Sequence, residues 1–262
     1  MDSWDQTFWE RTWRERSEAV RRAYGETDPP ETVCAFSWQD RIRCPGACAL
    51  ALPPVQSSRD PVRHGREHWL YLTLGLSQPL DERQVQAERA AGRKYSALGI
   101  EFAFVTTAKS PWANDALYYF ITYMTEGEVI RWGDRFPMLF HDRRGTLAVL
   151  TGDATGIDIS PVGKLRAVLF WPYLFPDWEL TTSTGKFMVL VATGITQAEW
   201  ELAQQTTTVH LLLLLCRAGI GQCTIPDRAC LLEDPRWRSQ WQSIERMPAE
   251  ECQQELRGFV GN

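Results

Sequence analysis

The sequence predicts one α/β domain in which helices flank a mixed β-sheet. Segments rich in β-branched and aromatic residues alternate irregularly with capped or amphipathic helical segments, and no internal repeat or long linker divides them. A chain of 262 residues, 44% hydrophobic and 23% charged, is long enough to bury a core without disulfides or metals. We therefore expect residues 1–262 to form a single domain.

The first half of the chain alternates expected elements with expected loops. Residues 3–24 are amphipathic and predict a helix. Its arginines are expected on a solvated face: Arg11, Arg14, Arg16, Arg21 and Arg22. Strands are predicted at residues 33–38, 68–76 and 100–107. Residues 45–66, rich in Pro, Ser and Arg, predict a surface loop, and the charged residues 81–94 predict a mobile insert.

The second half opens with Ser110-Pro111, a helix start that predicts a helix over residues 112–125. A turn is expected at residues 131–134, followed by an apolar segment at 136–140, a polar tip at 141–145 and a loop at 151–163. Strands are predicted at 146–150, 165–173, 187–195 and 223–225. Thr196 and Glu199 form a capping box that opens a helix to about residue 218. Its leucines 211–215 indicate burial on most sides, and the region after Asp234-Pro235 is expected to be helical in pieces.

Charge and hydropathy limit the classes of partner. The net charge is -5, and the pI near 5.5 argues against nonspecific nucleic-acid binding. The N-terminus lacks the basic start and apolar run of a signal peptide, and the densest apolar run, residues 211–216, is too short to span a bilayer. We therefore expect a cytoplasmic protein without membrane contact, whose seven cysteines remain thiols.

One metal site needs to be considered. Cys44 and Cys48, followed by His64 and His68, resemble the ligand order of a structural zinc site. Pro53, Pro54 and Pro61 disfavour the helix that normally carries the two histidines, and Gly65 lies between them. We therefore expect no metal, and two loop thiols with two unrelated histidines.

The motifs of common enzymes are missing. The sequence has no G-x-S-x-G elbow, phosphate-binding P-loop or dinucleotide fingerprint. His141-Asp142 and Cys223 are chemically competent, but no spacing joins them, and His210 in the leucine-rich segment is expected to be a packed core histidine. Neither catalysis nor a cofactor is expected.

Four ordered segments resemble the suppressor-of-fused domain family, over roughly residues 30–235. They are Glu67–Ser77 (EHWLYLTLGLS, similar to the family's EHWHYISFGLSD), Gly99–Phe104, Pro111-Trp112 with Tyr123 and Gly133-Asp134 downstream, and Phe187–Glu199 with its leucine-rich helix. The chain resembles a bacterial single-domain member with N- and C-terminal helical extensions, and compared with the family's animal members it carries an apparent insert around residues 141–163. The resemblance implies a mixed α/β fold and a non-enzymatic role in protein binding.

The resemblance also implies a binding face. In animal members the positions matching Tyr123 and Asp134 lie where a transcription-factor peptide is held as an added strand between two domains, whereas here only the N-terminal-type domain is expected. By its residue type, Asp134 either pairs with a basic partner or closes its own turn. Similarly, tryptophans 4, 9, 13, 237 and 241 either form a binding surface or are buried by terminal helices.

Three hypotheses about function follow. The first is an immunity protein that binds and neutralises a toxin, as the resemblance to bacterial members implies. The second is a regulatory or scaffold protein that binds a partner peptide by strand addition. The third is an enzyme of unrecognised type, for which His141 and Asp134 are the residues to vary.

Overall fold

The computed structural model describes most of the chain, namely residues 6–24, 31–34, 48–56, 67–79, 81–125, 129–137, 163–172 and 179–259. The described helices are α1 (Gln6–Tyr24), α3 (Glu82–Ala90), α4 (Pro111–Thr125), α6 (Gln197–Gln205), α7 (Thr208–Arg217), α8 (Pro235–Ile244) and α9 (Ala249–Gly258), with a 3-10 turn, η1 (Leu231–Glu233). The strands are β1 (Glu31–Cys34), β2 (Cys48–Gln56), β3 (Glu67–Thr73), β4 (Tyr95–Thr106), β5 (Arg135–Pro137), β6 (Leu165–Pro172), β7 (Glu179–Thr182), β8 (Gly185–Thr196) and β9 (Cys223–Thr224).

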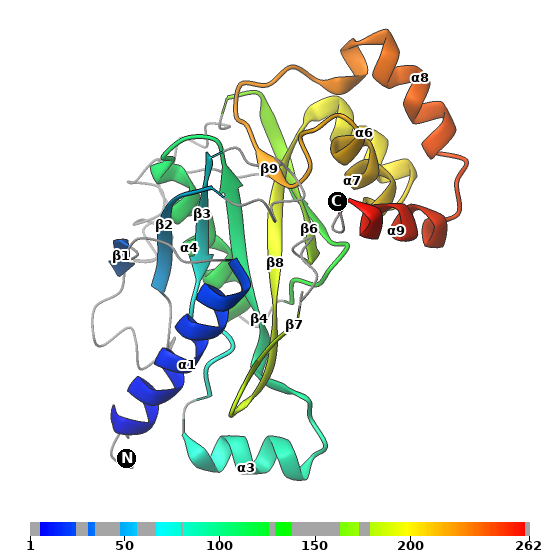
Figure 1. Ribbon diagram of the computed structural model, residues 1–262. Coiled ribbons are helices and arrows are strands. Elements are labelled where there is room, and N and C mark those ends of the chain that lie inside the picture. Colours follow the sequence, from blue (N-terminus) through cyan, green and yellow to red (C-terminus); the bar gives the residue numbers. More distant parts are fainter. Residues whose placement is uncertain are drawn as a thin grey trace, which may run out of the picture.

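These strands form one mixed sheet, which confirms the predicted fold class (Figure 1). The main order is β1-β2-β3-β4-β8-β6-β5, with β7 paired to β8 and β9 paired to β4. The central strands β4 and β8 run parallel, whereas their outer neighbours β3 and β6 are antiparallel to them. The two edges of this order are β1 and β5.

Alternation along the central strands produces two buried faces. Leu190 and Ala192 of β8 pack with α4 on one face, whereas Val189 and Val191 pack on the α1 face. Strand β4 follows the same rule: Phe102 and Phe104 face α4, and Ala103 and Val105 face α1. Because neighbouring residues of a strand point to opposite faces, both sides of a fully covered strand are apolar.

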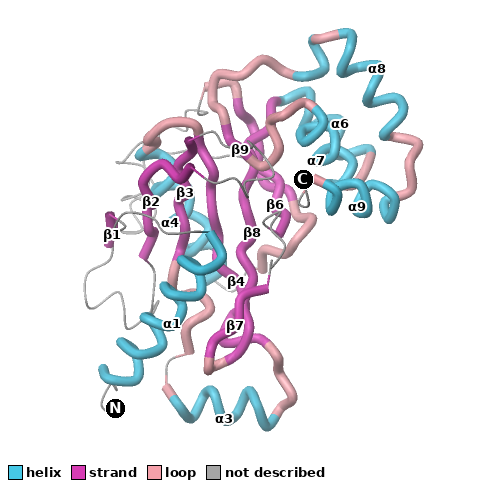
Figure 2. Tube along the Cα trace, in the orientation of Figure 1, coloured by secondary structure: helices cyan, strands magenta, loops and turns pink. Residues whose placement is uncertain are grey.

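The C-terminal helices form a third packing unit at one end of the sheet (Figure 2). Leu211–Leu215 of α7 are all fully buried, as their pattern predicted. They pack with residues of β6 and β8 and with the inner sides of the helices that follow, through Trp241, Ile244, Cys252 and Leu256. In the described part of the chain, no helix combines the length and apolar character of a membrane span.

The surface loop predicted over residues 45–66 is wrong for residues 48–56, which form strand β2, while the rest of that range lies outside the described residues. Strand β2 pairs with β1 and β3, despite carrying Pro53 and Pro54. The register to β3 shifts between Leu52 and Val55, and pairing with β1 reaches only Ala51. The prolines thus lie at a bulge, beyond the β1 ladder, where their missing N–H groups interrupt few hydrogen bonds.

Two helical predictions also need correction. Residues 81–94 are not a mobile insert, because Asp81 accepts a hydrogen bond from the Gln84 N–H and starts α3, which buries Val85 against the domain. The helix predicted from Thr196 to about 218 is two helices, α6 and α7, because Thr206 and Thr207 have extended backbones between them. The Glu199 half of the capping box is present: its carboxylate accepts the Thr196 N–H at 2.9 Å.

Most other elements lie where the sequence predicts them. The helix over 112–125 and the strands at 68–76, 100–107, 165–173, 187–195 and 223–225 are confirmed with shifted ends. The Ser110 hydroxyl donates to the Ala108 carbonyl at 2.8 Å, just before α4 begins. The insert at 141–163 lies outside the described residues except for Gly163, as does the strand expected at 146–150.

Arg16 does not belong to a solvated arginine face. Its side chain is fully buried, and its guanidinium donates to the Ser77 hydroxyl and carbonyl at 3.1 and 2.5 Å. It also donates to the hydroxyls of Ser96 and Thr184, each at 2.9 Å. Burial lowers the pKa of Arg16 to about 10, and the charge of Glu101 opposes that shift, so the group remains cationic at neutral pH. One helix is thereby joined to three other segments through hydrogen bonds.

Candidate functional site

Tyr123 and Asp134, the two residues expected at a binding face, converge on the β5 edge of the sheet. Tyr123 is half-buried on α4, and its ring packs against Phe136 of β5 with centroids 5.0 Å apart. Asp134 is half-buried and directly precedes the same strand. The structure therefore brings the two residues to one edge of the sheet.

The turn before β5 is held in place by hydrogen bonds on both sides. One Asp134 carboxylate oxygen accepts the Arg131 N–H at 2.7 Å, which is the turn-closing geometry considered from the sequence. Gly133 has a φ of +84°, which favours glycine, and its N–H donates to the Phe170 carbonyl at 2.7 Å. The Thr208 hydroxyl of α7 donates to the Gly133 carbonyl at 2.6 Å. The turn is thus fixed to both β6 and α7.

Apolar side chains are exposed beside this turn. Trp132 is 54% exposed and Val129 is 55% exposed. The indole of Trp132 stacks with that of Trp171 on β6, with centroids 6.3 Å apart and planes 18° apart. Large exposed apolar groups near a sheet edge favour a protein-binding surface. We name Val129, Trp132, Asp134 and Tyr123, with strand β5, the β5-edge site.

The terminal tryptophans do not form one binding surface. Helices α1 and α8, which carry Trp9, Trp13 and Trp237, lie at opposite ends of the molecule (Figure 1). Trp9 and Trp13 are half-buried and stack with centroids 5.1 Å apart, and Trp241 of α8 is buried. Burial by the terminal helices therefore describes these tryptophans better than a shared binding surface does. Trp4 lies outside the described residues.

The candidate zinc ligands do not meet on the described strands. In the β2–β3 register His68 lies opposite Val55, whereas Ala49, the neighbour of Cys48, lies opposite Thr73. His68 and Thr73 are five residues apart on β3, which at about 3.3 Å per residue is roughly 16 Å, and Cys48 lies one residue beyond Ala49. Zinc ligands lie about 2.0–2.3 Å from their ion, so Cys48 and His68 cannot share one. Cys44 and His64 lie outside the described residues.

The other chemically competent side chains have structural partners. His210 is buried, with Nδ1 2.6 Å from the Thr207 hydroxyl and Nε2 2.8 Å from the Met247 carbonyl. This confirms it as a packed core histidine, and Cys223 is buried as well. His141 and Asp142 lie outside the described residues. Within the described ranges, no cluster of three His, Cys, Asp or Glu side chains could hold a metal.

Two buried carboxylates are also held by protein groups. Burial raises the pKa of Glu101, against hydrogen bonds from Ser77 and Thr73 and from the backbone of Ser77 and Gly75. Burial acts the same way on Glu199, but hydrogen bonds and the charge of Arg228 outweigh it and lower the pKa of that carboxyl. The Glu199–Arg228 pair is bidentate, at 2.6 and 2.5 Å. Both carboxylates therefore hold the fold together.

Comparison with known proteins identifies the family. The family model described as suppressor of fused protein (SUFU) matches residues 52–229, which is most of the chain. The chain belongs to the suppressor of fused family. The matched range includes all four segments that carry the resemblance in the sequence. Comparison with curated protein sequences found no match.

Solved structures of suppressor of fused proteins share the fold. Drosophila Suppressor of Fused aligns with 88% of this chain at 18% identity and a TM-score of 0.61, but the chain spans only 54% of that protein. A chain from the Sufu-Fu complex aligns over 90% of this chain and 98% of its own length, at 18% identity and a TM-score of 0.60. A SUFU homolog from Neisseria gonorrhoeae FA 1090 aligns over 84% and 97%, at 13% identity and a TM-score of 0.54.

Proposed function

We propose that this chain is a non-enzymatic protein-binding domain and that its partner docks at the β5-edge site. The observation that carries the proposal is the convergence of Tyr123, Asp134 and exposed Trp132 at an edge of the sheet. The Sufu-Fu complex shows that one structural relative binds a protein, which supports the same class of function here.

We propose further that the partner is a toxin and that the chain acts as a bacterial immunity protein. A net charge of -5 suits a basic partner such as a nuclease toxin, because complementary charge accelerates association. The role predicts a secreted toxin encoded beside the gene, and the test is to co-express the chain with that toxin. We expect a stable complex and survival of the host cell; neither complex nor protection would exclude this role.

A matched pair of substitutions tests the surface separately. Val129→Ala and Leu98→Ala remove similar apolar groups, since the two residues are 55% and 51% exposed, but only Val129 lies at the β5-edge site. Together with Trp132→Ala, the Val129 variant is expected to weaken the complex, whereas Leu98→Ala leaves it unchanged. If Val129→Ala and Leu98→Ala change the affinity for the partner equally, the partner does not dock at the β5-edge site.

Strand addition is the second candidate, and the position of β5 favours it. In the described sheet β5 is an edge strand that pairs only with β6, and an edge strand presents backbone groups to an incoming peptide. A regulator or scaffold would use this mode. Recovery of a regulatory protein rather than a toxin in a pull-down, with the Val129 and Trp132 variants both deficient, would favour it.

A further inference from the structure

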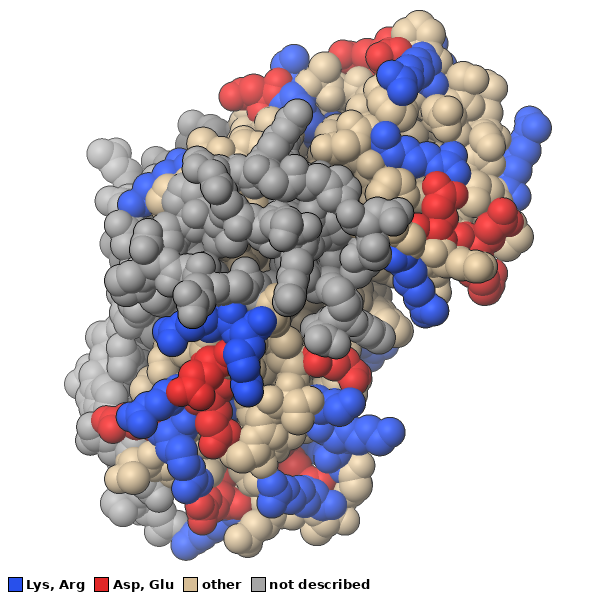
Figure 3. Space-filling view, viewed as in Figure 1, with Lys and Arg blue, Asp and Glu red and all other residues tan. Residues whose placement is uncertain are grey.

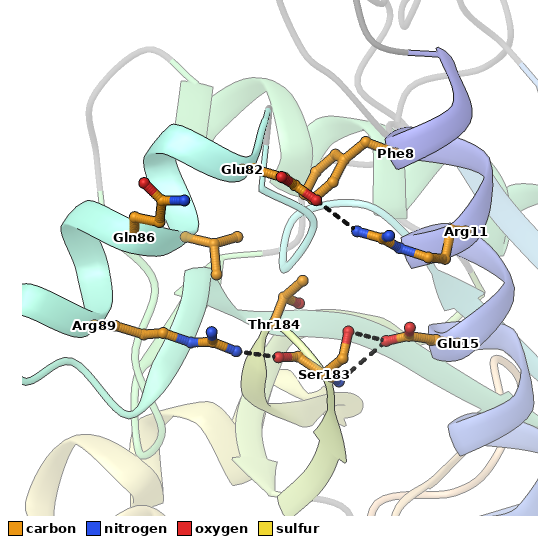
Figure 4. A pocket seen from close by; sticks show the side chains of 9 residues that line it. Phe8, Arg11, Glu15, Glu82, Gln86, Arg89, Ser183 and Thr184 are labelled. Atoms are coloured by element: carbon orange, nitrogen blue, oxygen red, sulfur yellow. Dashed lines mark hydrogen bonds and ion pairs between the residues drawn. The ribbon is translucent and has the colours of Figure 1, made fainter.

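A second candidate site lies in a pocket between α1, α3 and the β7–β8 turn (Figure 4). Its volume is about 420 Å³, within the range of small-molecule sites. Phe8, Val85 and Thr184 line it and are each at least nine-tenths buried. None of the residues of the β5-edge site lines this pocket, so the two sites are distinct.

Hydrogen bonds hold the walls of the pocket together. Arg11 of α1 forms an ion pair with Glu82 of α3 at 3.0 Å. Glu15 of α1 accepts from the N–H and hydroxyl of Ser183 at 3.0 and 2.5 Å, and Arg89 of α3 donates to the Ser183 carbonyl at 2.5 Å. Beneath the turn, Thr184 accepts from the buried guanidinium of Arg16. Three segments far apart in the sequence are thus fixed around one cavity.

The charges on the two helical walls run in opposite order. Helix α1 contributes Arg11 and then Glu15, one turn apart and therefore on one face, whereas α3 contributes Glu82 and then Arg89, two turns apart. The pocket rim consequently has no net charge. In Figure 3, basic and acidic side chains lie interspersed over this end of the molecule. A neutral rim of alternating charge gives little attraction to a single ion and favours a dipolar one.

Glu15 and Arg89 retain capacity to bind such a ligand. Within the described ranges neither forms a salt bridge, and the hydrogen bonds of both go to uncharged groups of Ser183, although the charge of Glu15 also acts on the buried Arg16. A carboxylate can accept about four hydrogen bonds and a guanidinium can donate five. Figure 4 shows the Glu15 and Arg89 side chains reaching the same residue from opposite walls of the pocket, so a ligand with one positive and one negative end can lie between them.

We infer that this pocket binds a small zwitterion of amino-acid or dipeptide size. Glu15 takes the ammonium group and Arg89 the carboxylate, while the ligand side chain packs on Phe8 and Val85. The Arg11–Glu82 pair closes the opposite side. This inference does not rest on the proposed toxin-binding function.

The test is calorimetric titration of the full chain with glycyl-L-leucine and L-leucine. We expect saturable binding of at least one, and no binding of N-acetyl-L-leucinamide, isovalerate or isoamylamine, which lack one or both charges. Glu15→Gln and Arg89→Gln should each weaken binding by about tenfold or more, because each removes one charge-assisted contact. Arg83→Gln is the control, since Arg83 is exposed on α3 but does not line the pocket.

Amide chemical shifts of the unmodified protein locate the ligand without a variant. We expect the largest changes at Ser183, Thr184 and the facing turns of α1 and α3. Absence of binding up to about 10 mM, equal binding of the uncharged probe, or shifts confined to another region would each overturn the inference.

Discussion

Arg16 shows how one side chain can determine where a helix lies. Replacing it with methionine keeps the apolar stem but removes the donors to Ser77, Ser96 and Thr184. We expect Arg16→Met to lower the free energy of unfolding by about 3–5 kcal/mol, because buried acceptors lose a charged partner. Urea denaturation measures the change. Arg14→Met is the control: Arg14 is exposed on the same helix, and its loss should change stability by less than about 0.5 kcal/mol.

If the two variants are equally stable, the Arg16 network contributes nothing to the docking of α1. If only Arg16→Met lowers the free energy of unfolding, the network explains why an arginine occupies a buried position. The amphipathic pattern of α1 does not reveal this position, because an arginine near the border of the apolar stripe is normally solvated.

Asp134 combines two possible roles that one pair of variants separates. Its carboxylate accepts the Arg131 N–H, so Asp134→Ala should cost about 1 kcal/mol through loss of the turn hydrogen bond. Asp134→Asn keeps an acceptor and should leave the unfolding midpoint nearly unchanged. If the carboxylate charge meets a basic partner group, the asparagine variant loses partner affinity in titration calorimetry. Unchanged affinity would leave Asp134 with the turn-closing role only.

At the scale of elements, the Glu199–Arg228 pair joins the start of α6 to the segment before η1. Burial alone would raise the pKa of Glu199, but Arg228 holds it below the usual 4.5. The folded state therefore binds this proton less readily than the unfolded chain. The resulting stability is complete above pH 4.5 and is lost as the pH falls through the lowered pKa.

We expect Glu199→Gln to be strongly destabilised at neutral pH, by about 3–5 kcal/mol, because Arg228 stays buried without its counter-charge. The difference from wild type should shrink as the pH falls below 4.5, as urea midpoints over an acid pH series would show. Burial raises the pKa of Glu101, so its protonation stabilises the folded state as the pH falls. This contribution is the same in wild type and variant, and it cancels in the difference between them. Glu201→Gln on the exposed side of α6 is the control; a constant difference across the pH series would argue against this role of Glu199.

Elements with strong local signals could be predicted from the sequence, and those set by distant contacts could not. The β-branched, apolar run of β8 and the Ser110-Pro111 start of α4 are local signals, and both elements form. Strand β2 forms despite its prolines because β1 and β3 pair around the bulge. Helix α3 forms from a charged segment because Asp81 caps its start and its Val85 and Glu88 side chains are buried, and tertiary burial of this kind is not visible in the segment's own sequence.

At the scale of the whole molecule, both candidate sites depend on the order of the sheet. The resemblance indicates Tyr123 and Asp134, but not the stacking of Trp132 on Trp171, which follows from the pairing of β5 with β6. At the pocket, Ser183 donates a hydrogen bond to Glu15, and no local sequence pattern predicts a contact between residues so far apart in the chain. For the first site, a tryptophan beside a turn glycine, Trp132-Gly133, is the sequence feature that could have pointed to an exposed aromatic group.

The helices after the family-matched segment provide a last test of how the molecule is organised. The family model ends at residue 229, whereas Trp241 and Ile244 of α8 and Leu256 of α9 pack on the leucines of α7. A chain truncated after Ala229 should therefore expose an apolar helix face that the sheet alone leaves uncovered. We expect it to aggregate or to bind a hydrophobic dye, with a broadened unfolding transition.

A milder variant keeps this prediction testable if the truncated chain cannot be purified. Ile244→Ala should cost about 2–5 kcal/mol, because the side chain is fully buried, whereas Ser243→Ala on the exposed side of α8 should be nearly neutral. Both are measured by urea denaturation. A soluble, monomeric, cooperatively folded truncation would mean that the matched segment is complete in itself, and that α8 and α9 are attached to it rather than part of its core.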